Sequence, residues 1–238
     1  MIKLIDGEER YLDEYKEAYN LSVEKIKEGL IKKHDLMFLN PDEIDIIQKM
    51  KDSRDRTKLK PNYVPSYDYF IVDGDKFIGR ISIRIELTPK LLQFGGNIGY
   101  GIHPKYWKQG YGTMALKLGL EKAKEIGLKD KVLITCDDDN IGSYKIIEKN
   151  GGILENKIEN TDDDEVFLTR RYWVKLWEAC WKKVADNYNS HSMKISRKSM
   201  IRFSFFVDCI FGWFYKKIRP KRTWYIEYAF LWTFRLIG

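Results

Sequence analysis

The segment from Asn97 to Thr113 constrains the fold more than any other part of this sequence. It reads N-I-G-Y-G-I-H-P-K-Y-W-K-Q-G-Y-G-T, a short apolar strand that continues through Pro104 into a glycine-rich loop and then begins a helix. Gly110 and Gly112 allow the backbone to adopt positive φ and to approach a ligand closely. Consecutive N–H groups and the positive end of the helix would then face one anion. The segment therefore predicts a phosphate-binding turn, with a plain structural turn as the alternative.

Two better-known phosphate-binding motifs do not fit this loop. A dinucleotide-binding fold places G-x-G-x-x-G directly after a strand, and a P-loop has G-x-x-x-x-G-K-[ST]. Neither spacing occurs between Asn97 and Thr113. The sequence therefore argues against both of these nucleotide-binding modes.

The chain up to residue 175 predicts short strands and helices in an α+β order. Apolar and polar residues alternate in some segments and recur at helical spacing in others. The predicted elements are strand 1–5, a helix over 12–30, a helix from Asn40, two strands that meet at Asp73-Gly74, strand 98–102, a helix from Thr113, strand 132–135, a helix through Ile146, and strands 153–158 and 165–173. Segment 51–65 is predicted to be a loop over the substrate side. This order predicts a sheet with helices on both faces.

The loop and its neighbours resemble the GNAT-type N-acetyltransferases. The acyl-CoA pyrophosphate loop of that family is usually Arg/Gln-x-x-Gly-x-Gly/Ala, and this chain has W-K-Q-G-Y-G, with Trp107 in place of the Arg or Gln. The phrases F-I-G-R-I-S-I-R, G-N-I-G-Y-G-I-H-P, L-I-T-C-D-D-D-N, I-I-E-K-N-G-G-I-L-E-N and R-R-Y-W-V look like a branch of bacterial predicted acetyltransferases of unassigned substrate. The resemblance covers residues 1–175 and implies a GNAT-like, mixed and mostly antiparallel sheet.

The resemblance also implies a donor and an acceptor. The donor would be acetyl-CoA, and the acceptor would be a primary amine of a small molecule or peptide that attacks the thioester directly. Gly99 and Gly101 would let the pantetheine arm pair with an opened strand, and the backbone N–H groups near Tyr100 to Ile102 would stabilise the oxyanion. The implied cofactor-binding residues are Tyr100, Gly101, Ile102, Lys108, Gln109, Gly110, Tyr111, Gly112, Thr113, Asn140 and Ser143. Asn140 is equally a candidate helix N-cap.

The group that would protonate the leaving thiolate departs from the family pattern. Many GNAT enzymes have a tyrosine in the phrase L-Y-E-K-x-G-F, and the matching phrase here has Ile147 in that place. Ser143 and Tyr144 are the nearest candidate donors. A thiol has a pKa near ~8.5, so it leaves as thiolate without a strong acid.

The candidate general bases are acidic residues. Glu86 is the first candidate, on the polar face of its predicted strand, and Asp137 acting through water is the second. Glu86 has an alternative role as an ion-pair partner of Arg84 or Arg80. His103 stands where the family often has arginine and is expected at the surface or on the phosphate side.

No metal site is expected. The acidic runs 137–139 and 162–164 lack the alternating spacing of a calcium loop, so the first is interpreted as helix-capping and the second as a solvated turn. Cys136 ends a predicted buried strand, which favours an inert thiol. Cys136, Cys180 and Cys209 are an odd number without C-x-x-C spacing. A cytoplasmic protein without a secretory signal is therefore expected.

The last quarter of the sequence differs in composition from the rest. From Lys175 onward there are 13 Lys and Arg against 4 Asp and Glu, whereas residues 1–174 have 29 against 31. The same tail holds five of the seven tryptophans. We therefore expect two parts, a GNAT-like domain over 1–175 and a basic, aromatic-rich extension over 176–238. The extension suits packing or self-association, or attachment to an anionic membrane surface, better than binding of nucleic acid.

Two functions remain as alternatives from the sequence. The first is an active N-acetyltransferase, which the glycine loop, the glycine-containing strand and Asn140 all favour. The second is a non-catalytic acyl-CoA-binding module, which Trp107 and Ile147 favour. A protein governed by its basic tail is a weaker third.

Overall fold

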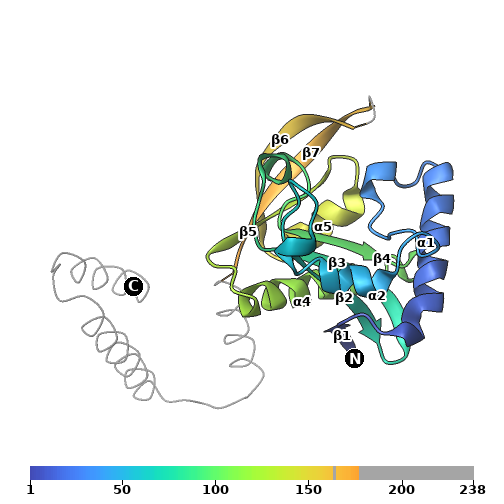
Figure 1. Ribbon diagram of the computed structural model, residues 1–238. Helices are drawn as coiled ribbons and strands as arrows, with labels where there is room; N and C mark the ends of the chain where they lie inside the picture. Colours follow the sequence, from blue (N-terminus) through green and yellow to red (C-terminus); the bar gives the residue numbers. More distant parts are fainter. Residues whose placement is uncertain (163–164, 177–238) are drawn as a thin grey trace, which may run out of the picture. The chain divides into compact units, whose positions relative to one another are not determined.

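The computed structural model describes residues 1–162 and 165–176 (Figure 1). Its strands are β1 (Ile2–Ile5), β2 (Ser66–Asp73), β3 (Lys76–Arg84), β4 (Ile98–Ile102), β5 (Lys131–Asp137), β6 (Gly152–Asp162) and β7 (Glu165–Lys175). Its α-helices are α1 (Leu12–Lys27), α2 (Ile46–Asp52), α3 (Pro89–Gln93), α4 (Tyr111–Glu125) and α5 (Ile141–Lys149). Single-turn helices are η1 (Glu9–Tyr11), η2 (Lys33–Asp35), η3 (Arg56–Lys58) and η4 (Pro104–Tyr106). The predicted extension beyond Leu176 lies outside the described residues.

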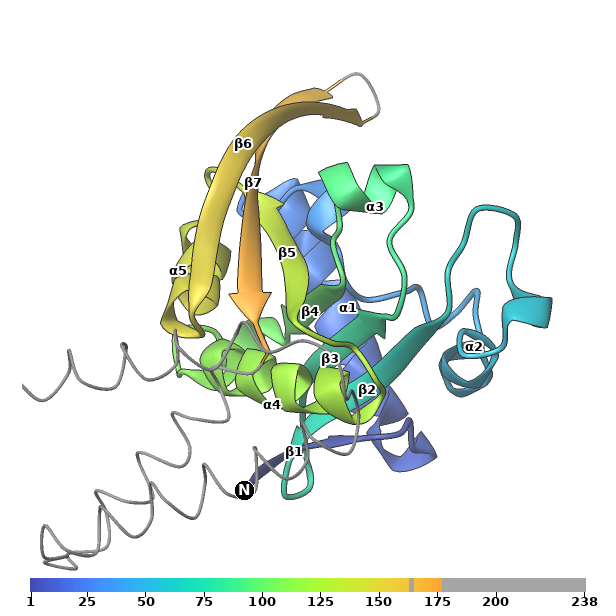
Figure 2. The same ribbon diagram turned by 90° about the vertical axis from the view of Figure 1, so that its left-hand side faces the viewer.

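The strands form two antiparallel sheets. The first has the order β1-β2-β3-β4 and the second the order β5-β7-β6. The predicted hairpin at Asp73-Gly74 joins β2 to β3, and Gly74 has the positive φ of 62° that favours glycine in tight turns. β6 and β7 form a long hairpin that extends beyond the helices in Figures 1 and 2. The predicted α+β fold is therefore confirmed.

One buried residue, Asn97, connects the two sheets. Its backbone N–H donates to the carbonyl of Leu133 at 2.7 Å, and its side-chain oxygen accepts from the N–H of Leu133 at 2.8 Å. Its side-chain nitrogen donates to the carbonyl of Arg84 at 3.1 Å. Within the described residues, β4 and β5 are not hydrogen-bonded neighbours in either sheet. The sheets are therefore joined at Asn97, and beyond it the edges of β4 and β5 are open toward each other.

Helices cover both faces of the first sheet, as predicted. Figure 2 shows α4 and α1 on opposite sides of β2 and β3. On one face Leu116 and Leu120 of α4 pack with Ile71 and Ile81. On the other face α1 and α2 pack against β2 and β3 in a second cluster of buried residues, which are Tyr11, Tyr15, Ala18, Phe38, Ile46, Met50, Phe70, Val72 and Phe77. Burying one such large side chain stabilises the fold by about 1.5–3 kcal/mol.

The prediction of a helix from Asn40 was wrong. The side chain of Asn40 accepts from the N–H of Asp42 and donates to Glu43, which closes a turn instead. The helix α2 begins at Ile46, where Asp45 caps the N–H of Gln48 at 2.9 Å. Asn40 and Asp45, five residues apart, both have side chains that can cap a helix, and the helix begins after Asp45.

Among the helices of residues 1–162 and 165–176, none is both long enough and apolar enough to cross a membrane.

Candidate active site

The predicted phosphate-binding turn lies at the start of α4. Gly110 has φ of 85° and is the N-cap residue, and the helix begins at Tyr111, two residues before the predicted start. A Cβ on Gly110 would meet no atom within 4 Å, so the backbone conformation alone requires glycine there. Lys108, Gln109 and Gly110 are exposed. The first N–H groups of a helix lack partners within it, so this exposed turn offers donors and positive potential to an anion.

Gly112 has a different role from the one predicted. It lies inside α4 and is buried, rather than adopting positive φ in the loop. A Cβ at this position would lie 2.5 Å from Cδ1 of Ile146 on α5. Gly112 is therefore needed because α4 and α5 pack closely there.

β4 turns part of its backbone toward β5. In the antiparallel pairing with β3, the N–H of His103 donates to the carbonyl of Ile78. Every second residue of β4 faces β3 in the same way, so Gly101 and Gly99 also turn their backbone groups toward β3. The residues between them, Tyr100 and Ile102, therefore point their N–H and C=O groups away from β3. These are the groups predicted to meet the pantetheine arm and the oxyanion.

The indole of Trp107 uses one of these groups. Its N–H donates to the carbonyl of Ile102 at 2.8 Å. The residue that replaces the family's Arg or Gln thus fixes the end of β4 to the loop that follows. The N–H groups of Tyr100 and Ile102 are not involved in this contact.

Close packing against Met37 is a further reason why positions 99 and 101 of β4 are glycines. A Cβ on Gly101 would lie 2.7 Å from Cβ of Met37, and one on Gly99 would lie 2.9 Å from its Cε. Arg80 holds this crossing segment by donating to the carbonyl of Met37 at 2.7 Å. Gly99 and Gly101 therefore admit the segment that follows η2, as well as opening the strand.

The N-terminus of α5 brings three predicted residues to the same place. Asn140 is the N-cap, as predicted, and its side-chain oxygen accepts from the N–H of Ser143 at 3.0 Å. The hydroxyl oxygens of Tyr100 and Ser143 are 3.2 Å apart. Burial raises the pKa of Tyr100, so its phenol is a neutral hydrogen-bonding group. β4 and α5 are thereby linked through Tyr100 and Ser143.

Cys136 is buried and inert, as expected. Burial raises the pKa of its thiol to about 12, although a hydrogen bond from Ser143 acts in the opposite direction. A nucleophilic thiolate is therefore absent at this site at neutral pH.

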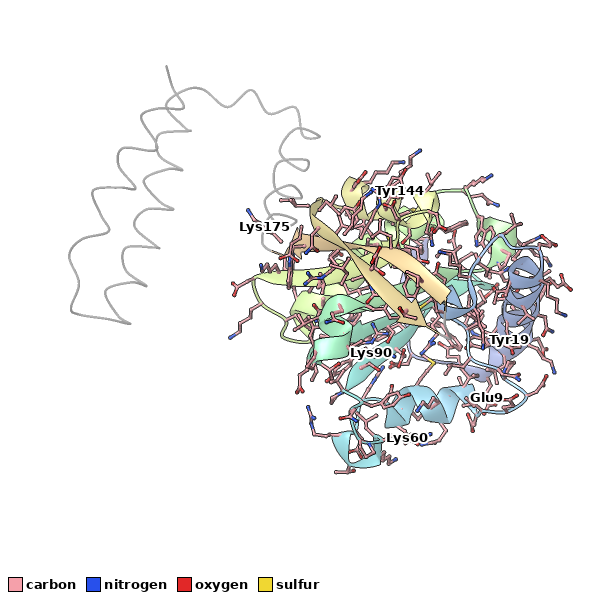
Figure 3. All side chains as sticks on the ribbon, turned by 90° about the horizontal axis from the view of Figure 1, so that it is seen from above. Glu9, Tyr19, Lys60, Lys90, Tyr144 and Lys175 are labelled. Carbon is pink, nitrogen blue, oxygen red and sulfur yellow. The ribbon has the colours of Figure 1, made fainter. Side chains whose placement is uncertain are left out.

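The candidate acids for the leaving thiolate, Ser143 and Tyr144, lie in different surroundings on α5. Ile147, at the family's tyrosine position, is fully buried in the core. Tyr144 is half-buried on α5, at the edge of the molecule in Figure 3, and the guanidinium of Arg170 lies 4.1 Å from its ring centroid. Ser143 contacts Tyr100, so Ser143 is the one that belongs to the opening between β4 and β5.

Glu86 does not lie on a strand face. β3 ends at Arg84, and Glu86 is half exposed and forms an ion pair with Arg56 of η3. The alternative prediction, that Glu86 pairs with Arg84 or Arg80, is wrong as well. Arg80 pairs with Asp68 at 2.7 Å, and Arg84 donates to loop carbonyls.

The expectation for His103 is also wrong. Its side chain is 2% exposed, and Nδ1 accepts from the N–H of Lys105 at 3.2 Å. Burial lowers the pKa of this imidazole, although Glu17, with a carboxylate oxygen 3.6 Å from Nε2, acts in the opposite direction. His103 is therefore a buried residue next to α1 and not a surface residue.

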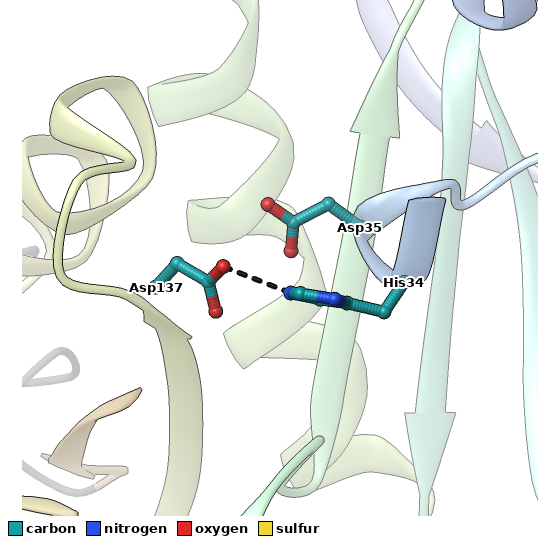
Figure 4. A group of neighbouring side chains, drawn as sticks. All are labelled: His34, Asp35 and Asp137. Atoms are coloured by element: carbon teal, nitrogen blue, oxygen red, sulfur yellow. Dashed lines mark hydrogen bonds and ion pairs between the residues drawn. The ribbon is translucent and has the colours of Figure 1, made fainter. Parts of the chain in front are cut away.

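Asp137, the second predicted general base, ends β5 and meets two residues of η2 that the sequence analysis did not single out (Figure 4). His34, Asp35 and Asp137 point toward one another, and Nε2 of His34 is 2.8 Å from a carboxylate oxygen of Asp137. We call these three residues the His–Asp cluster. Lys32 places its ammonium 3.1 Å from the same oxygen of Asp137. The ring of His34 stacks on Phe167, with 4.1 Å between ring centroids.

Asp35 connects the His–Asp cluster to α5. The amide nitrogen of Asn140 donates to a carboxylate oxygen of Asp35 at 3.3 Å. Burial and the charge of Asp137 raise the pKa of Asp35 to about 6, although His34, Asn140 and Lys32 partly offset the shift. A carboxylate with such a pKa can take up and release a proton near neutral pH.

The His–Asp cluster also has the composition of a metal site. Its three ligand atoms lie within 4.8 Å of one another. The ammonium of Lys32 already occupies one carboxylate oxygen of Asp137, which weakens the case for a metal ion coordinated by that oxygen.

Comparison with known proteins gives a family for the chain. The profile of the acetyltransferase (GNAT) domain matches residues 32–153, just over half of the chain. The comparison with curated proteins finds no match.

The fold is similar to that of solved structures of low sequence identity. The microcin C7 self-immunity acetyltransferase MccE, solved with acetyl-CoA and AMP, is 17% identical at a TM-score of 0.54, over 73% of this chain and 92% of that one. An acetyltransferase of the GNAT family from Bacillus anthracis is 17% identical at a TM-score of 0.54, over 74% and 95%. RimL, an α-N-acetyltransferase of ribosomal protein L7/L12, is 18% identical at a TM-score of 0.54, over 73% and 90%.

Proposed function

Because this chain belongs to the GNAT acetyltransferase domain family, we propose that it transfers an acetyl group from acetyl-CoA to a primary amine of a small molecule or peptide. The amine attacks the thioester directly, without a covalent enzyme intermediate. The observation that carries the proposal is the opening between β4 and β5, where the N–H groups of Tyr100 and Ile102 point away from β3.

Two parts of the chain would hold the donor. The exposed turn of Lys108, Gln109 and Gly110, with the first N–H groups of α4, suits the pyrophosphate of acetyl-CoA. The N–H groups of Tyr100 and Ile102 suit the pantetheine arm and the oxyanion that forms when the amine attacks.

The rest of the rate enhancement comes chiefly from holding the amine next to the thioester. Bringing an amine and a thioester together in the correct orientation is worth several kcal/mol, roughly 7–11 in favourable cases. A thiolate with a pKa near ~8.5 is a good leaving group, so the buried Ile147 in place of tyrosine does not prevent the reaction. Ser143 and the phenol of Tyr100 offer hydrogen bonds at the same edge.

A second candidate function is an acyl-CoA-binding module without turnover. The absence of a tyrosine at position 147 and the indole of Trp107 at the end of β4 favour it. This alternative retains donor binding and lacks acetyl transfer, so one pair of measurements separates the two.

The test measures thiol release from acetyl-CoA against a panel of polyamines, aminoglycosides, amino acids and peptides, together with acetyl-CoA binding by calorimetry. We expect binding in the micromolar range and amine-dependent thiol release with at least one class. Binding without release for every amine would establish the binding module. Absence of binding would contradict both functions.

We propose further that residues 1–175 are the acetyltransferase domain and that 176–238 form a separate module. The support is compositional, since the second segment combines clustered Lys and Arg with most of the tryptophans of the chain. Such a segment suits peripheral attachment to an anionic membrane from the cytoplasmic side, or self-association.

A further inference from the structure

We propose that the His–Asp cluster receives the acceptor as a cationic amine and that Asp35 is the general base that deprotonates it. This inference rests on the proposed acetyl transfer and adds to it the class of acceptor and the identity of the base. Three observations carry it, which are the location of the cluster, its charge, and an unpartnered buried oxygen.

The His–Asp cluster lies at the same opening as the donor groups. Asp137 is the last residue of β5, and Asp35 accepts a hydrogen bond from Asn140, the N-cap of α5. Asp35 is also close enough to Tyr100 and Cys136 for its charge to raise the pKa of both. The carboxyl of Asp35 therefore lies near Tyr100 of β4, Cys136 of β5 and the start of α5.

The charges of the cluster suit a cation. The cluster brings two carboxyl groups, Asp35 and Asp137, together with a single lysine, Lys32. The exposed Asp139 shares Lys32 at 3.1 Å, so even this compensation is divided. An incoming ammonium group would supply the missing positive charge.

One oxygen of the cluster lacks a donor. The side chain of Asp137 is 1% exposed, and its Oδ2 is engaged by His34 and Lys32. Its Oδ1 is buried and has no hydrogen-bond partner in residues 1–162 and 165–176. Such an oxygen is costly to leave unpaired. An ammonium group has three N–H donors, so one that entered the cluster could donate both to this oxygen and to Asp35.

His34 acts as a positioning residue. Its ring is stacked on Phe167 and edge-on to Phe94, with centroids 4.1 and 5.6 Å away, and its Nε2 holds Asp137. These contacts fix the orientation of the carboxylate of Asp137. The proton itself passes to Asp35.

The proton transfer and the acyl transfer balance as follows. The ammonium gives one proton to the carboxylate of Asp35, and the neutral amine uses its freed lone pair to form the C–N bond to the thioester carbonyl. The C–S bond then breaks, and the thiolate takes up the second nitrogen proton through water. Asp35 returns its proton to solvent, so the sum is ammonium plus thioester giving amide, thiol and one released proton.

The protonation behaviour of Asp35 supports this role. Its raised pKa of about 6 reflects burial and Asp137, opposed by His34, Asn140 and Lys32, which are the groups that face it. It is therefore ionised at pH 7 and above. The rate should fall on the acid side with an apparent pKa near that value.

The test uses the full chain, with spermidine and a peptide with an N-terminal serine as the probe amines. Asp35→Asn keeps the hydrogen bonds of Asn140 in reach but removes the base. We expect kcat to fall about a hundredfold or more, the acidic limb of the pH–rate profile to disappear, and the Kd for acetyl-CoA to stay within twofold. Asp42→Asn, which removes an exposed carboxylate paired with Lys16, is the matched control and should leave all three quantities unchanged.

Two further variants separate chemistry from structure. Asp35→Glu should restore part of kcat and the acidic limb. His34→Gln should raise the KM of the amine more than it lowers kcat, because the base remains. If Asp35→Asn keeps kcat within threefold with the same acidic limb, the inference is wrong while acetyl transfer stands. If activity is lost to EDTA and recovered with added Zn²⁺, the cluster is a metal site instead. If the wild-type protein acetylates no amine of the panel, the proposed function itself fails.

Discussion

At the scale of single residues, Asp35 and Asp137 illustrate how burial assigns different roles to two carboxylates. Asp137 is held by a histidine and a lysine and is almost completely enclosed. Asp35 accepts from a neutral amide and lies near the negative charge of Asp137. The first is therefore held in place by its partners, whereas the second has a pKa that suits proton exchange.

The stability of the protein should report the same property. The pKa of Asp35 is about 6 in the folded protein and near 3.8 when unfolded, so ionisation opposes folding. Its favourable contribution is complete below pH 3.8 and is lost as the pH rises through 6. We therefore compare the free energy of unfolding of Asp35→Asn with that of wild type. The difference should favour the variant by on the order of 1–3 kcal/mol more at pH 8 than at pH 5. Urea unfolding at the two pH values measures this. Equal differences at both would contradict the raised pKa.

Tyr144 provides a second test at this scale. Its ring lies against Arg170, and phenylalanine would keep that contact while removing the hydroxyl. Since a thiolate leaves without a strong acid, we expect Tyr144→Phe to lower kcat less than about tenfold in the thiol-release assay. A thousandfold loss would identify Tyr144 as the acid.

Local signals in the sequence were sufficient for some of these residues and not for others. The cap role of Asn140 and the positive φ of Gly110 were predicted because each depends on the adjoining backbone. The contact of His34 with Asp137 spans 103 positions along the chain and depends on where the segment that follows η2 crosses β4. No pattern near either residue indicates it.

At the scale of elements, the two ends of α4 form a natural pair for comparison. Gly110 at its start has φ of 85° and Gly127 after its end has φ of 100°, and a Cβ at either would meet no atom within 4 Å. Alanine would therefore strain both turns by a similar amount, about 1 kcal/mol, without a steric clash.

Only the first of these turns is proposed to bind acetyl-CoA. Gly110→Ala should weaken acetyl-CoA binding about tenfold and reduce the thermal shift at millimolar ligand, whereas Gly127→Ala should leave both unchanged. Calorimetry and thermal denaturation of the two variants measure this. Equal ligand responses in the two would remove the turn from the donor site.

Elements with one strong signal were predicted more accurately than elements with two. The β2–β3 hairpin followed from Asp73-Gly74, and the strands β6 and β7 were predicted on either side of an acidic turn. The start of α2 was misplaced because Asn40 and Asp45 both have capping side chains. The short helix α3 was not among the predicted elements.

At the scale of the whole molecule, the order of elements was enough to predict the fold class but not the division into two sheets. That division depends on Asn97, whose side chain bridges β3 and β5 through Arg84 and Leu133. An asparagine before a strand carries no local sign of such a bridge.

The proposed independence of residues 176–238 is also a property of the whole chain. Truncation after Leu176 should leave the Kd for acetyl-CoA within twofold. Full-length protein, unlike the truncated form, should sediment with vesicles containing anionic lipid at low salt or should self-associate in analytical ultracentrifugation. Loss of acetyl-CoA binding on truncation would contradict the division into two parts, as would a full-length protein that does neither.

The junction at Asn97 has a consequence for amide hydrogen exchange. The N–H groups of Asn97 and Leu133 are paired in the free protein, so they should exchange slowly. Those of Tyr100 and Ile102, a few residues along the same strand, point away from β3 and should exchange much faster. Adding acetyl-CoA should slow these two amides while leaving the junction unchanged. The exchange rates of these two amides therefore report whether acetyl-CoA occupies the opening between the sheets, even when the acceptor is unknown.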